Sequence, residues 1–134
     1  MDLIKELKEE HLEIVETLTR VEQLGISPTD AQRKLVVAKD MIVSHVEKED
    51  KFFYPVLIEA VTGDRMMGRL VDMLSQGMQD ISEYVFGFFT SYADGGAGIE
   101  FIVAFGELFA LVKSRVRREE EILFPEFERA VHEP

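Results

Sequence analysis

Histidine and glutamate side chains occupy positions of this sequence where a helix facing a core should be apolar. His45 and Glu49 are four residues apart, which places them one turn apart on the same helix face. His11 and Glu119 interrupt similar apolar stripes elsewhere in the chain. Imidazole nitrogens and carboxylate oxygens from facing helices hold iron or manganese in helical bundles. These residue types and this spacing therefore favour a metal ion bound between helices.

Arg115 lies on the same stripe as Glu119, four residues before it. A buried carboxylate is costly unless a cation lies nearby, so the core around Glu49 and Glu119 must contain positive charge. Two hypotheses follow. In the first, a metal ion is held by His11, His45, Glu49 and Glu119. In the second, no metal binds, Arg115 forms salt bridges with both glutamates, and the histidines are hydrogen-bonded.

Each of these two glutamates belongs to a short acidic run. The runs span residues 47–50 and 119–121. Only one member of each run fits the apolar stripe of its helix. We therefore expect Glu49 and Glu119 to point inward and the other acidic side chains of the two runs to be solvated.

Length and composition restrict the class of protein. The chain has 134 residues, 46% of them hydrophobic, which suits one domain spanning residues 1–134. Its net charge of −11 opposes binding to nucleic acid or to anionic membranes. The lack of cysteine excludes disulfides and thiolate metal sites. The amphipathic start and the absence of a long charge-poor run indicate a cytoplasmic protein without a membrane partner.

Breaker residues divide the chain into four helical segments. The breaks fall at Gly25 to Pro28, Thr62 to Asp64, and Ala93 to Gly98. The predicted helices span residues 2–24, 29–61, 65–92 and 99–131. Ser27 and Asp64 are candidate N-caps, and Pro28 suits a first helical turn. Pro55 and Pro125 should kink or end the regular part of their helices.

The two halves of the chain resemble each other. The second and fourth helices match at an offset of 70 residues, and the first and third match at an offset of 67. The first match pairs His45 with Arg115, Glu49 with Glu119, Tyr54 with Phe124 and Pro55 with Pro125; the second pairs His11 with Met78. An all-α, up-down-up-down four-helix bundle made of two pseudo-symmetric helical hairpins is the predicted fold.

These residues resemble the hemerythrin-like, HHE cation-binding family. The resemblance spans nearly the whole chain and is strongest in EEHLEIVETL, HVEKEDKFFYP and EEEILFP. It implies two non-haem irons bridged by carboxylates, used for dioxygen carriage, for iron or oxygen sensing, or for repair of iron centres. By the same resemblance His11, His45 and Glu49 match metal ligands, and Glu119 matches the bridging carboxylate.

The sequence departs from the family pattern at two pseudo-equivalent positions. Met78 and Arg115 stand where the third and fourth helices usually provide histidine. Arginine does not deprotonate to bind a metal, so one metal position is kept and the other is lost. We expect at most one ion per chain, iron before manganese, in a sensing or metal-handling module. The alternative is a metal-free interaction or structural bundle. No nucleophile and base pair is evident, so we do not expect an enzyme.

Apolar residues surround the third and fourth helices near the glycine-rich break. They are Tyr84, Val85, Phe86, Phe88 and Phe89 on the third helix, and Phe101, Ile102, Val103, Phe105, Phe109, Leu111 and Val112 on the fourth. A helix that is apolar on all sides must be covered on several sides. The pattern predicts a homodimer through these two helices, with Phe89 and Phe101 in the interface. The alternative is that the glycine-rich break or the connection between the first and second helices folds over these residues.

Overall fold

A computed structural model of the chain describes residues 2–24, 29–92 and 98–132. Its helices are α1 (Leu3–Leu24), α2 (Thr29–Lys48), η1 (Glu49–Phe53), α3 (Tyr54–Ala60), α4 (Arg65–Ser91), α5 (Gly98–Arg118), η2 (Glu119–Leu123) and α6 (Phe124–His132). The described residues contain no strand. Among them, no helix combines the length and the apolar character needed to cross a membrane. The all-α prediction is confirmed.

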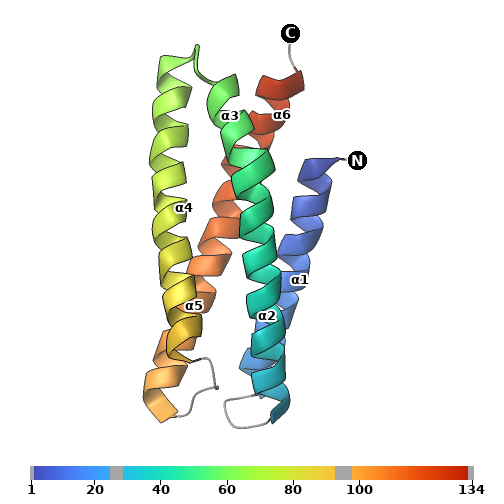
Figure 1. Ribbon diagram of the computed structural model, residues 1–134, viewed down its shortest axis with the longest axis vertical. Helices are drawn as coiled ribbons and strands as arrows, with labels where there is room; N and C mark the ends of the chain where they lie inside the picture. The colour runs from blue at the N-terminus through green and yellow to red at the C-terminus, as the bar shows by residue number, and fades with distance from the viewer. Residues whose placement is uncertain (1, 25–28, 93–97, 133–134) are drawn as a thin grey trace.

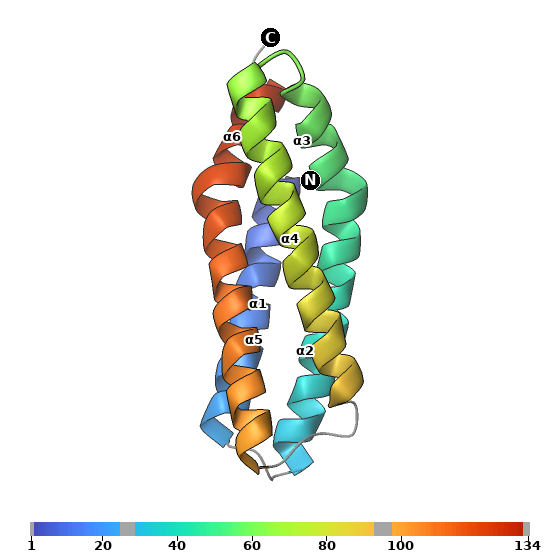
Figure 2. The same ribbon diagram turned by 90° about the vertical axis from the view of Figure 1, so that its left-hand side faces the viewer.

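The helices pack as an elongated antiparallel four-helix bundle (Figure 1). Helix α1 lies beside α2, and α4 lies beside α5. The short helices α3 and α6 continue α2 and α5 at one end of the bundle, and they contact each other there (Figure 2). The observed order is the predicted pair of helical hairpins, and the helix ends lie within two residues of the expected ones.

Helix α4 begins at a side-chain cap. The Asp64 carboxylate accepts a hydrogen bond from the backbone nitrogen of Met67 at 3.0 Å, as expected for an N-cap. The turn from Val61 to Gly63 precedes it. The other predicted cap, at Ser27 and Pro28, lies outside the described residues.

A π-helical segment precedes Pro55, and another precedes Pro125. In η1 and η2 the backbone hydrogen bonds span five residues instead of four. The nitrogen of Tyr54 donates to the carbonyl of Glu49, and the nitrogen of Phe124 donates to the carbonyl of Glu119. Proline lacks an N–H and crowds the carbonyl four residues earlier, which disfavours the tighter α-helical bond. The expected irregularity therefore lies in a five-residue segment that ends two residues before each of Pro55 and Pro125. Each widened turn places on the inner face its first glutamate and the aromatic residue that follows the turn. These residues are Glu49 and Tyr54 for η1, and Glu119 and Phe124 for η2.

Five phenylalanines of α4 and α5 pack against one another inside the chain: Phe88, Phe89, Phe101, Phe105 and Phe109. Phe86 of α4 stays 39% exposed. Phe88 lies 5.3 Å from Phe89 and 6.0 Å from Phe101, measured between ring centroids. Phe89 and Phe101 are each only 4% exposed. This corrects the expectation that they form an interface: the crossing of the two helices already covers them. Outside this cluster, Ile102 and Val103 remain 52% and 55% exposed.

Candidate metal centre

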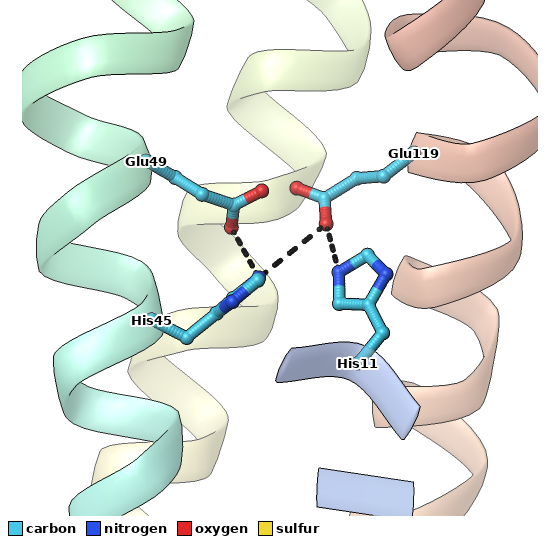
Figure 3. Close-up of side chains that lie close together, drawn as sticks. All are labelled: His11, His45, Glu49 and Glu119. Atoms are coloured by element: carbon cyan, nitrogen blue, oxygen red, sulfur yellow. Dashed lines mark hydrogen bonds and ion pairs between the residues drawn. The ribbon is translucent and has the colours of Figure 1, made fainter. Parts of the chain in front are cut away.

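Four side chains predicted from the sequence meet in the middle of the bundle. His11 comes from α1, His45 from α2, Glu49 from η1 and Glu119 from η2. All four are buried, and one ligand atom from each lies within 4.8 Å of the others. Figure 3 shows the two carboxylates side by side, with both imidazoles directed at them. The group thus joins residues that are up to 108 positions apart in the chain.

The distances between these atoms resemble those inside a coordination sphere. The Nε2 atom of His11 lies 2.9 Å from Oε1 of Glu119, and Nε2 of His45 lies 3.2 Å from Oε1 of Glu49. Ligand atoms about 2.1 Å from one ion, at a right angle, are about 3 Å apart. His45 Nε2 is 4.0 Å from Glu119 Oε1. A small contraction would bring all four residues onto one ion.

Each histidine is held from behind by a further carboxylate. The Nδ1 atom of His11 donates to Glu120 Oε2, and that of His45 donates to Glu10 Oε1, both at 2.7 Å. A carboxylate on Nδ1 fixes the imidazole so that Nε2 faces the centre, the arrangement found around metal-bound histidines. The Glu120 carboxylate therefore has a structural partner, which corrects the expectation that it is simply solvated.

The Glu10 carboxylate is itself anchored on the protein surface. It forms an ion pair with Lys48, whose ammonium also pairs with Glu6. Burial opposes ionisation of Glu10, but the hydrogen bonds from Lys48 and His45 outweigh it and lower its pKa. Glu10 and Lys48 were not among the residues predicted for the centre. The sequence does contain a signal for them: Glu10 directly precedes the predicted ligand His11, and Lys48 lies three residues after the predicted ligand His45.

Arg115 is buried and paired with both glutamates, as predicted. It is 8% exposed; its Nη2 donates to Glu49 Oε1 at 3.0 Å, and its Nε lies 3.5 Å from Glu119 Oε2. Burial favours loss of its proton, but the negative charges of Glu119 and Glu49 outweigh burial and raise the pKa of the guanidinium. Its Nη1 donates to Ser82 Oγ at 2.7 Å and to the Met78 carbonyl at 3.3 Å. Arg115 therefore ties η1, η2 and α4 together.

The ionisation of the glutamates and of His45 is strongly perturbed. Burial, assisted by the charge of Glu119, raises the pKa of Glu49 to about 7. In Glu119 the hydrogen bonds with His11 and His45 overcome burial and hold the pKa well below its usual range. Burial opposes the charge on His45, but Glu119 and Glu49 outweigh it and raise its pKa to about 10. The two carboxylates thus stabilise positive charge on the groups around them.

Tyr54 is a further member of the centre that the sequence analysis did not identify. Its hydroxyl donates to Glu119 Oε2 at 2.6 Å, which leaves Oε1 directed at the histidines. Burial and the nearby carboxylates raise the pKa of its hydroxyl. The pseudo-equivalent Phe124 stacks on His11 with ring centroids 5.4 Å apart. Only the widened turn of η1 turns Tyr54 inward, and a helical wheel drawn for a regular α-helix misses it.

Among the described residues, three buried polar atoms of the centre have no hydrogen-bond partner. They are Nε2 of His45, Oε2 of Glu49 and Nε of Arg115. An unsatisfied buried polar atom costs free energy, and a bound cation would satisfy the first two of these. In the metal-free protein the raised pKa of His45 lets its imidazolium, together with Arg115, balance the two carboxylates, and a bound cation would take the place of the proton on His45. The residues present therefore fit one metal ion.

A small apolar cavity of about 30 Å³ lies beside the two histidines. Aliphatic side chains from all four long helices line it: Ile14, Ile42, Val46, Ile81, Val85, Val112 and Val116. A water molecule needs roughly 10–15 Å³ measured with a probe of its own size, so the cavity has room for a ligand of two or three atoms.

Comparison with known proteins agrees with this geometry. The Hemerythrin HHE cation binding domain matches residues 2–127, which is nearly the whole chain. No curated protein and no solved structure matches the chain. A domain match of that extent, over a bundle whose centre gathers histidine and glutamate, places the chain in the hemerythrin HHE cation-binding domain family.

Proposed function

We propose that the chain binds one iron ion through His11, His45, Glu49 and Glu119. The observation that supports this most directly is the pair of carboxylates behind the histidines, which orients both Nε2 atoms toward the glutamates. A set of two nitrogens and two oxygens suits iron or manganese better than a thiolate-preferring metal. Tyr54 and Arg115 would hold the two carboxylates in place.

A second ion has no comparable set of ligands. The positions that pair with His11 and His45 carry Met78 and Arg115, and a guanidinium cannot coordinate. Its positive charge replaces that of a second divalent ion beside Glu49 and Glu119. Reversible dioxygen carriage by the hemerythrin route needs two irons. We therefore propose a mononuclear metal-binding or sensing module of the cytoplasm rather than an oxygen carrier or an enzyme.

Metal analysis of the purified protein tests this proposal. After anaerobic loading with ferrous ion and removal of the excess, we expect one iron per chain. His45→Ala should lose the ion, and Lys51→Ala, an exposed change in η1, should keep it. Two tightly bound ions per chain would refute the single-site proposal. If no ion binds under any loading condition, the metal-free alternative holds, in which the Arg115 salt bridges stabilise an interaction bundle.

Association through α4 and α5 is a separate part of the proposal. The phenylalanine cluster is internal, so the candidate contact is the exposed apolar surface of α5 at Ile102 and Val103. We expect a dimer in sedimentation at micromolar concentration. Val103→Glu should dissociate it, while Val37→Glu, at a position of similar exposure on α2, should not. A monomer at that concentration would remove this part of the proposal.

A further inference from the structure

A groove of about 610 Å³ opens between α2–α3 and α4, on the side of the bundle that carries Met78. The acidic side chains of Asp50 and Glu83 line it, together with the polar side chains of Ser75, Gln79 and Ser82. Arg115, which comes from α5, is also part of its lining. The groove therefore extends from the surface to the guanidinium that pairs with both buried glutamates.

The internal repeat shows that part of the polar lining of this groove is specific to one half of the molecule. Gln79 and Ser82 of α4 correspond to Leu12 and Val15 of α1, which are apolar. Asp50 corresponds to Glu120, whose carboxylate is engaged by His11. Met78 offers no such donor. The carboxylate of Asp50 is thus left beside the groove, and a row of polar side chains leads inward from it.

Arg115 and Ser82 stand between the groove and the metal centre. Both residues line the groove and also the small cavity beside His11 and His45. The hydrogen bond from Arg115 Nη1 to Ser82 Oγ, at 2.7 Å, joins α5 to α4 at this point. Only this pair and the apolar side chains of Val46 and Phe86 are shared by the two linings. Movement of one long side chain would connect them.

We propose that this groove is the route by which a divalent metal ion enters and leaves the centre, with the Arg115–Ser82 contact closing its inner end. The inference rests on the metal-binding function proposed above. The negative carboxylates along the groove attract a hydrated cation. The hydroxyl and amide oxygens of its lining can then replace water molecules bound to that cation. Arg115 would have to swing aside, because a guanidinium repels a passing cation.

Rates of metal transfer test the route. In Gln79→Trp a large ring fills the groove at an exposed position, and Leu12→Trp is the matched control on the other half, where the native side chain is 66% exposed. We would follow the binding of ferrous ion under anaerobic conditions and its loss from loaded protein to a chelator. Gln79→Trp should slow both rates by about tenfold or more and leave the equilibrium affinity unchanged, since it raises only the barrier. Leu12→Trp should leave both rates nearly unchanged.

A second variant tests the inner end of the route. Ser82→Ala removes one hydrogen bond from Arg115 without filling any space, so both rates should rise together. Unchanged rates in Gln79→Trp, or equal slowing in Leu12→Trp, would overturn the route while leaving metal binding intact. Failure of the unsubstituted protein to bind ferrous ion would instead refute the metal-binding function, and the route would fall with it.

Discussion

The two halves of the bundle handle the same pair of buried carboxylates in different ways. On one side, His11 and His45 face Glu49 and Glu119, and each histidine is held by an outer carboxylate. On the other side, one guanidinium contacts both glutamates directly and fixes itself to α4. The outer residues differ accordingly, because Gly77 stands at the position that corresponds to Glu10. An imidazole needs a carboxylate behind it to present Nε2 to a metal, whereas a guanidinium carries its own charge.

This contrast teaches that a guanidinium can pair with both buried carboxylates in the half where no imidazole faces them. A buried glutamate requires a cation, and either a metal ion or an arginine provides one. The half-site with Met78 and Arg115 therefore remains compatible with the fold, and the half-site with His11 and His45 keeps the geometry of a ligand set.

The largest expected effect is on stability. Arg115→Met would remove the guanidinium that pairs with both Glu49 and Glu119, so the free energy of unfolding of the metal-free protein should fall by about 3–5 kcal/mol. Arg117→Met, an exposed change in the same helix, should change it by less than about 0.5 kcal/mol. Chemical denaturation of chelator-treated protein measures both. Equal stability of the two variants would mean that the buried ion pairs do not compensate the glutamates.

A second variant would make the two halves alike. Combining Met78→His with Arg115→His restores imidazoles at both pseudo-equivalent positions, and Asp50 already stands where Glu120 stands on the other side. We expect metal analysis to find two ions per chain in place of one. A double variant that folds but still binds a single ion would show that the halves are not equivalent as metal sites.

The smallest expected effect concerns the outer carboxylates. Glu120→Ala removes the acceptor from His11 Nδ1, and the affinity for metal should fall by about 10–100-fold. Asp50→Ala, the matched change on the other half, should leave the equilibrium affinity unchanged. Competition with a chelator of known affinity compares the two. A similar loss in both variants would point to a general effect of negative charge instead of orientation of His11.

Much of the fold and part of the centre were predictable from the sequence. Helix positions follow from the spacing of Leu, Ile and Val and from the glycine-rich breaks, since both act over a few residues. The pairing of Arg115 with Glu49 and Glu119 was predictable as well, because all three interrupt core stripes and a buried charge requires a partner. The match between the two halves predicted two helical hairpins, and α1 indeed packs beside α2 and α4 beside α5.

Other features were decided by the tertiary structure. The π-helical turns that bring Tyr54 to Glu119 arise from how each helix accommodates its proline, and a regular wheel does not represent them. The outer partners Glu10 and Glu120 and the anchor Ser82 sit on different helices from the groups they bind. The sequence by itself determined which side chains share a helix face, because that depends on local geometry. Which atoms meet across the bundle depends on how the helices are packed, and only the folded structure settles that.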